Sequence, residues 1–388
     1  MDLLNNMGEQ NQSVWGRILS LIGRVLLAIS IPLIAFYVLY QGFLFLRDSN
    51  APQIVITLVA IVWGVGGVAI LYLIFNNLVE KLSDTWRTRL LPFVFVGPAM
   101  AILSWYLAIP TVRTFWLSLF DRNGPPKGLN LLQQLSSDAF VGLGNYVEVF
   151  QPGGLMFLAF RNNLMWIIFG STLSVSFGLI IAVLADRSRM EKIAKSFIFL
   201  PMAISFVGAS IIWNFIYEYR PPGQPQVGLL NAFVTGLGGQ PQAWPQWVNI
   251  APWNNLFLIV IVIWLQAGFA MVLFSAALKG IPEELLEAGR IDGANEFQIF
   301  FRIMIPYIQG TIISVWTTIV IFTLKIFDVV WVMTGGQFGT HVIATQFYRQ
   351  SFTNNNSGYG SAIAIVLLIA VIPVMYYNLK QFRKQEAF

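Results

Sequence analysis

Long apolar runs recur along this chain, and each one is long enough to cross a lipid bilayer as a single helix. A span needs roughly 20 predominantly apolar residues, and eight runs of that kind alternate with polar segments. They cover residues 25–45, 54–75, 93–112, 164–184, 196–216, 256–278, 310–333 and 361–379. Because lipid cannot bond to backbone N–H and C=O groups, spanning segments satisfy these groups internally as helices. The runs therefore predict an all-α, polytopic membrane protein with about eight transmembrane helices.

The composition agrees with this class and excludes several kinds of site. Hydrophobic residues make up 56% of the chain and charged residues 11%, which leaves too little polar surface to cover a soluble globule of 388 residues. Cysteine is absent, so disulfides, thiolate catalysis and cysteine-ligated metals are excluded. His341 is the single histidine, which excludes a multi-histidine metal site and leaves one candidate base for a catalytic triad.

The Lys and Arg residues indicate an orientation in the membrane. If both termini are cytoplasmic, fifteen of the 23 basic residues lie in cytoplasmic segments, seven lie outside and only Lys325 lies within a span. Cytoplasmic loops carry such an excess, so we expect both termini in the cytoplasm. The net charge of +5 then reflects this topology, and we expect no nucleic-acid partner.

The longest charge-dense passage between two apolar runs of the second half is residues 279–306, which we name the docking stretch. Two short helices are its expected structure. Pro282 suits a first helical turn, and two glutamates follow it where negative charge complements the helix dipole. Gly289 and Gly293 are expected to interrupt the helix, and Asp292 to cap a second helix that begins near Gly293. The pattern indicates a rigid protein-docking element, and a mere polar connector is the alternative.

The docking stretch resembles the EAA loop of ABC importer permeases. That loop carries E-A-A, a glycine four residues after the third position, and I-x-L-P ten residues after the glycine. The matching residues here are Glu287, Ala288, Gly289, Gly293, Ile303 and Pro306. Gly289 replaces the usual second alanine and Ile305 replaces the leucine, which are small or conservative changes. Several fixed positions over some twenty residues make the match specific, whereas a lone glycine would carry no weight.

The resemblance implies a type I ABC importer permease core and a role for several matched residues. In that family the loop is the coupling helix, seated in a cleft of a separate ATPase subunit. Glu287 would then meet the ATPase surface, Gly293 would permit the bend between the helices, and Asp292 would stabilise the second helix. Closure of the ATPase would move the docking helices and switch the spans between outward-open and inward-open arrangements.

Two further passages narrow the resemblance. Residues 291–294 are similar to the carbohydrate subgroup and to maltose-type subunits, and residues 199–232 look closer still to alpha-glucoside permeases. The resemblance covers residues 91–388, a six-helix core, and leaves 1–90 as an extension with two transmembrane helices. It implies import of an alpha-glucoside or other oligosaccharide across a bacterial inner (plasma) membrane. The implied partners are a second permease subunit forming a heterodimer, two ATPase subunits and an extracytoplasmic solute-binding protein.

The sequence shows no means of hydrolysing ATP. It contains no G-x-x-x-x-G-K-[ST] motif and no Gly-Lys pair, so it offers no P-loop to cradle nucleotide phosphates. We therefore expect a non-catalytic transport subunit without cofactors of its own, with ATP and magnesium bound by the partner ATPase. An intramembrane enzyme is disfavoured because the single histidine and the scattered carboxylates form no recognisable catalytic cluster.

Candidate residues for the solute pathway lie in two spans of the second half. Lys325 and Asp328 are ionisable groups inside an expected span, where charge is costly and normally faces a polar cavity or a partner. They are three residues apart, so we expect them on one helical face and able to pair. An ion pair that only fixes helix packing is the alternative. By resemblance, Gln266, Phe322 and Thr323 fall near the sugar-contacting positions of the family.

Two other transport functions stay open. An ABC permease could carry a non-sugar solute such as a polyol, a glycerol phosphate or an amino acid, because the external binding protein largely determines selectivity in that family. A proton- or sodium-coupled secondary carrier could use Lys325 and Asp328, and it would work without an ATPase. Uptake into vesicles without ATP would distinguish such a carrier from an ABC permease.

Overall fold

The computed structural model describes residues 30, 34, 37–38, 40–48, 51–82 and 84–385. The chain divides into two compact units, Met1–Pro110 and Thr111–Phe388. Apart from turns, loops and one isolated bridge between Phe120 and Phe140, the described residues are helical. The expected all-α class is therefore confirmed. The first expected span, 25–45, lies mostly outside the described residues.

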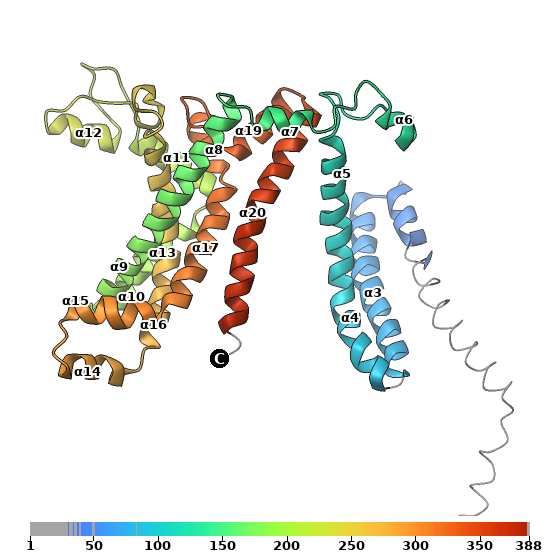
Figure 1. Cartoon of the computed structure of the whole chain (residues 1–388), viewed down its shortest axis with the longest axis horizontal. Helices are drawn as coiled ribbons and strands as arrows, with labels where there is room; N and C mark the ends of the chain where they lie inside the picture. Colours follow the sequence, from blue (N-terminus) through green and yellow to red (C-terminus); the bar gives the residue numbers. More distant parts are fainter. Residues whose placement is uncertain are drawn as a thin grey trace, which may run out of the picture. The chain divides into compact units, whose positions relative to one another are not determined.

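The first unit contains two long helices, α3 (Gln53–Glu80) and α4 (Asp84–Leu103), which lie side by side (Figure 1). α3 contains the expected span 54–75 and continues it to Glu80. The rings of Tyr72 and Phe95 pack between the two helices with their centroids 5.4 Å apart. Most of α3 is nevertheless uncovered, because only 6% of its apolar window is buried.

α4 continues through a π-helical turn (Ser104–Ala108) into α5 (Ile109–Leu117). The expected third span, 93–112, therefore began too late. The charged residues at its start indicated a loop, but Asp84 lies in the first helical turn, where a carboxylate complements the helix dipole. The expected boundary at residue 90 between extension and core falls inside α4.

The second unit is built around α13 (Asn255–Lys279), which confirms the expected span 256–278. α13 packs along α9 (Thr172–Asp186). Buried side chains of both helices, among them Phe274 and Val175, belong to one hydrophobic cluster. α13 is enclosed far more than α3, since 56% of its apolar window is buried.

α9 is the second half of a 32-residue apolar segment. α8 (Leu155–Met165) and a π-helical turn (Trp166–Ser171) precede it. The expected span 164–184 was thus too short at its start. Asn162 and Asn163 explain the error, because two adjacent amides indicate a loop, whereas here both are buried inside the helix and bonded to other segments.

The expected span 196–216 is not a single helix. α10 (Glu191–Phe199) leads into a 3-10 turn (Leu200–Ala203), and α11 (Phe206–Ile216) then leaves at 103°. The turn contains a proline, which has no N–H for the helical ladder. The side chain of Ser205 caps α11 by accepting the backbone N–H three residues on at 3.0 Å.

The expected span 310–333 is also broken. α17 (Gln309–Leu324) ends after 16 residues, and α18 (Asp328–Thr334) starts after a gap. Asn163 of α8 satisfies the freed backbone: its Nδ2 donates to the carbonyl of the last residue of α17 at 3.1 Å, and its Oδ1 accepts the N–H of Ile343 at 2.8 Å. Irregular backbone at membrane depth is tolerated where protein groups satisfy it in this way.

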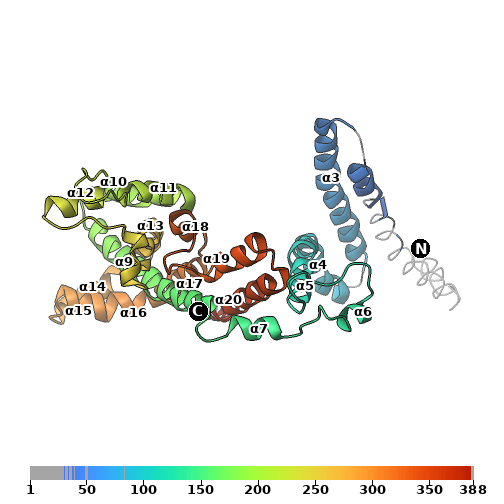
Figure 2. The same ribbon diagram turned by 90° about the horizontal axis from the view of Figure 1, so that it is seen from above.

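The last helix, α20 (Ser357–Gln385), contains the expected span 361–379 and packs against α17. Figure 2 shows α9, α13, α17 and α20 gathered in the second unit. The shorter helices are α6 (Leu131–Leu135), α7 (Gly144–Val149), α12 (Leu229–Gly236) and α19 (Ile343–Tyr348). In the described part of the chain, four helices could cross a membrane, or six with each bent pair taken as one span. The expected number of eight is not confirmed.

Candidate functional site

The docking stretch projects as short helices at one end of the second unit, opposite α12 and α19 (Figure 1). In order, its elements are α14 (Glu283–Ile291), α15 (Glu296–Ile299), a π-helical turn (Phe300–Met304) and α16 (Ile305–Tyr307). The expected pair of short helices is confirmed. Two glutamates occupy the first turn of α14 and Arg290 its last turn, so charge complements the helix dipole at both ends.

Gly293 makes the bend between α14 and α15. Its φ is +82°, a left-handed conformation that suits glycine because it has no Cβ. The N–H of Gly293 donates to the carbonyl of Arg290 at 3.0 Å, and the N–H of Ala294 donates to that of Gly289 at 3.0 Å. These bonds close the C-terminal end of α14 and fix the direction in which the chain leaves it.

Asp292 does not cap the second helix, so that expectation was wrong. It is the C-cap that directly follows α14, and the N-cap of α15 is Asn295. The Asn295 side chain accepts the N–H of Gln298 at 2.9 Å, and the Gln298 side chain accepts the N–H of Asn295 at 2.9 Å. This reciprocal pair is a capping box, and its N-x-x-Q spacing was readable in the sequence.

Gly289 does not interrupt α14, contrary to expectation. The helix runs unbroken through it to Ile291, and Gly289 is buried. A Cβ at this position would lie 2.6 Å from Cδ1 of Ile303. Ile303 stands in the π-helical turn that follows α15, so the missing side chain lets the second half of the stretch pack against the first.

The outward side of the docking stretch combines charge with uncovered apolar groups. Glu287 and Ala288 are exposed, and Glu287 forms no ion pair with any described residue. Ile291 is 86% exposed, and the exposed rings of Phe297 and Phe301 contact each other with centroids 4.5 Å apart and planes tilted by 49°. Exposed apolar patches of this kind, bordered by charge, mark protein interaction sites.

Glu296 ties the docking stretch to the chain before α10. Its carboxylate pairs with Arg290 at 3.2 Å and with Arg187 at 2.8 Å. Its side chain is half exposed, and hydrogen bonds from Arg290 and then Arg187 hold its pKa below the usual range of a glutamate. Arg187 belongs to the turn after α9, which the sequence patterns did not connect to the docking stretch.

Three of the five expected pathway residues lie within the long helices α13 and α17. Gln266 is buried on α13, and its side-chain amide forms no hydrogen bond with another described residue. Thr323 is fully buried on α17, where its hydroxyl bonds to that of Ser171 at 3.1 Å and to backbone carbonyls of its own helix. Phe322 is 48% exposed. The Thr323 hydroxyl is therefore used in bonds that hold α17 in place. The amide of Gln266 and the exposed ring of Phe322 are available to contact a solute.

Lys325 and Asp328 do not share a helical face, so their expected pairing is wrong. Lys325 is the exposed residue that directly follows α17, and Asp328 begins α18 on the other side of the break. The structure shows no ion pair between them. The three-residue spacing would have paired them only in a continuous helix, and here the Asp328 carboxylate instead lies in the first turn of α18.

A polar cluster that the sequence patterns missed fixes this break. Asn162 donates from its Nδ2 to the carbonyls of Gly339 at 2.7 Å and His341 at 2.8 Å. The His341 side chain lies 3.1 Å from the guanidinium of Arg349. Asn162 and the neighbouring Asn163 thus hold both edges of the irregular segment between α17 and α19. The double asparagine beside an apolar run was the available signal.

The described residues contain no group of three His, Asp or Glu side chains able to hold a metal ion. A cavity of about 200 Å³ follows α11, and its lining includes Asn214, Tyr217, Glu218 and Gln246. It is smaller than the roughly 300 Å³ at which ligand pockets begin, and none of the five expected residues lines it.

Comparisons with known proteins agree on one family. Residues 174–385 match the family described as binding-protein-dependent transport system inner membrane component. The osmoprotective compounds uptake permease protein GgtC of Synechocystis sp. is 52% identical over 293 residues, which cover 76% of this chain and 99% of that protein. The alpha-glucoside transport system permease protein AglF of Rhizobium meliloti is 49% identical over 296 residues, covering 76% and 83%.

A solved structure supports the fold at greater distance. One chain of a bacterial ABC transporter involved in the import of the acidic polysaccharide alginate superposes with a TM-score of 0.62 at 20% identity. The match covers 78% of this chain and 99% of that one. At this identity the likeness concerns the fold alone.

Proposed function

This chain belongs to the binding-protein-dependent transport system inner membrane components, the permeases of ABC importers, and we propose that it imports an alpha-glucoside or another oligosaccharide. The name of the Rhizobium meliloti relative supports the sugar. The Synechocystis relative, named for osmoprotective compounds, favours a second candidate cargo, a compatible solute. The proposed location is the bacterial inner membrane, with both termini in the cytoplasm.

The observation that carries the proposal is the docking stretch. Its bend at Gly293 and its close packing at Gly289 give it a defined shape. On its outer side, Glu287 and Ile291 are exposed. We assign this surface to a cleft of the ATPase subunit. Two such subunits would bind ATP and magnesium, while a second permease subunit and an extracytoplasmic solute-binding protein complete the importer.

The pathway is proposed to lie on the surface that the second permease covers. Phe322 and Lys325 are exposed at the end of α17, and the amide of Gln266 is unbonded on the neighbouring α13. An aromatic face and an amide suit a sugar, which presents hydroxyl groups around an apolar ring. Asp328 begins α18 just beyond them, and Thr323 holds α17 in place through its bond to Ser171.

The test is transport by the assembled importer in proteoliposomes. Labelled alpha-glucoside enters only when the solute-binding protein is outside and ATP is available to the ATPase. Glu287→Lys and Gly293→Asp abolish uptake and substrate-stimulated ATP hydrolysis while membrane insertion is unchanged. Glu80→Lys, a charge reversal at an exposed residue of α3, is the matched control and transports normally. Coupled transport in both docking variants would contradict the assignment, and uptake without ATP would favour an ion-coupled carrier.

A further inference from the structure

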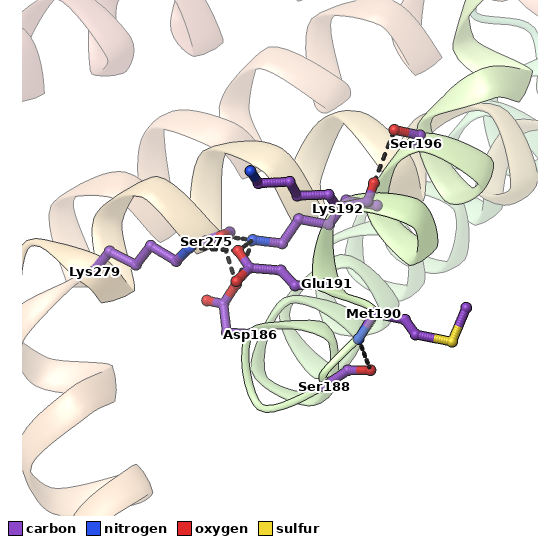
Figure 3. A network of polar contacts seen from close by, with 9 residues as sticks. Asp186, Ser188, Met190, Glu191, Lys192, Ser196, Ser275 and Lys279 are labelled. Atoms are coloured by element: carbon purple, nitrogen blue, oxygen red, sulfur yellow. Dashed lines mark hydrogen bonds and ion pairs between the residues drawn. The ribbon is translucent and has the colours of Figure 1, made fainter.

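Lys195 contacts polar side chains of three helices, α9, α10 and α13. From α10 it pairs with Asp186 at the end of α9 and with Glu191 at 2.6 Å, and it donates to Oγ of Ser275 on α13. The Ser275 hydroxyl in turn donates to Asp186 at 2.7 Å. Figure 3 shows Asp186, Glu191 and Ser275 converging. The side chains of Lys195 and Asp186 are only 18% and 17% exposed, so water screens this network weakly.

The same network reaches the start of the docking stretch. Glu191 also pairs with Lys279, which stands in the last turn of α13, four residues before α14 begins (Figure 3). At the other end of α14, Glu296 links Arg290 to Arg187. Residues 186–195 therefore contact the chain on both sides of α14.

The helices that carry these residues are locked together by backbone contact. A Cβ on Gly268 of α13 would lie 2.5 Å from the carbonyl oxygen of Ile198 in α10. A Cβ on Gly178 of α9 would lie 2.9 Å from the backbone N of Met271 in α13. Neither contact leaves room for a side chain, so α9, α10 and α13 are packed closely enough to move as one body.

We propose that residues 186–195 form a brace between the docking helix and the transport helices, which holds α14 at both ends and passes its displacement to α9, α10 and α13 together. The inference rests on the proposed coupling to an ATPase, and it adds Arg187 and Glu191 as positioning residues. Neither residue belongs to the docking stretch itself. Without the brace, α14 keeps the backbone link near Lys279 and the packing of Leu286 against the hydrophobic cluster of α9 and α13, but it has no polar link to α10 among the described residues.

The test compares uptake per ATP hydrolysed in the complete importer. Arg187→Met removes the ion pair with Glu296, and Glu191→Gln removes the negative charge that pairs with Lys195 and Lys279. Both leave the surface of α14 untouched. Each lowers the ratio about threefold and the double variant about tenfold, the usual size of coupling between sites. Arg187→Lys retains the positive charge and should retain most of the uptake per ATP hydrolysed. Arg189→Met in the same turn and Lys192→Met at the start of α10 alter exposed residues that form no ion pair with another described residue, and these matched controls couple normally.

A purely structural network predicts a different result. Loss of stability lowers insertion and total ATP hydrolysis together and leaves the uptake ratio of the surviving complexes intact, which would overturn the brace. Arg187 and Glu296 are more than half exposed, so Arg187→Met keeps the test valid even if Glu191→Gln inserts poorly. An unchanged ratio in the double variant of a working importer also overturns the brace. A wild-type complex without ATP-dependent uptake would instead refute the proposed function.

Discussion

α3 and α13 have equally high mean hydropathy over their apolar windows, yet 6% of one window and 56% of the other are buried. Both are long enough to cross a bilayer. Hydropathy thus identifies a span but does not say whether protein or lipid surrounds it. The difference in burial between α3 and α13 depends on which side chains let a neighbouring helix pack closely.

Glycine illustrates the point. Gly268 of α13 faces the backbone of α10 so closely that no side chain could fit. Gly64 and Gly66 of α3 have no described atom within 4 Å of where a Cβ would be. Small residues permit close helix packing in a membrane. The sequence of one helix does not show whether a neighbouring helix packs against them.

The largest expected effect comes from adding a side chain at Gly268 and comparing it with the same change at Gly64. Gly268→Leu places a side chain against the backbone of α10 and should cost about 3 kcal/mol or more, because close-packed backbone cannot move aside. Gly64→Leu on α3 meets open space and should leave the protein near wild type. Thermal unfolding and the yield of monodisperse protein in detergent measure both. Equal stability of the two variants would erase the distinction between the helices.

A smaller effect is expected from two asparagines. Asn163→Ala leaves the carbonyl of Leu324 and the N–H of Ile343 buried without a partner and should cost about 2 kcal/mol. Asn76→Ala on α3 removes only a surface bond to Glu80 and should cost about 0.5 kcal/mol or less. Thermal unfolding of the two variants in parallel tests the prediction, which fails if Asn76→Ala is the more damaging.

The smallest effect is expected from removing the first two predicted spans. A chain that begins at residue 83 loses α3, which buries little of its surface, and keeps α13 with all its neighbours. An even number of spans is removed, so the distribution of basic residues still favours the same orientation. ATP-dependent uptake should stay close to that of the full chain. A complete loss of uptake would show that the first two spans have a role in transport beyond helix packing.

The sequence was sufficient where one apolar run forms one helix, as in α13 and α20. It was insufficient at 310–333, because that break depends on Asn163 from a distant segment. The break within 196–216 has local signals, Pro201 in the turn and Ser205 as the cap of α11. In the docking stretch the two helices were predictable from local charge and glycines. The cap at Asn295 was readable but overlooked, whereas the contact between Gly289 and Ile303 and the bridge from Arg187 are tertiary.

The central claim is that the docking stretch is a cytoplasmic surface held by an ATPase, and site-directed labelling tests it most directly. The chain has no cysteine, so Glu287→Cys introduces a unique thiol. A membrane-impermeant maleimide should label it in inside-out vesicles and not in right-side-out vesicles, and added ATPase subunits should protect it. Labelling in right-side-out vesicles would contradict the account.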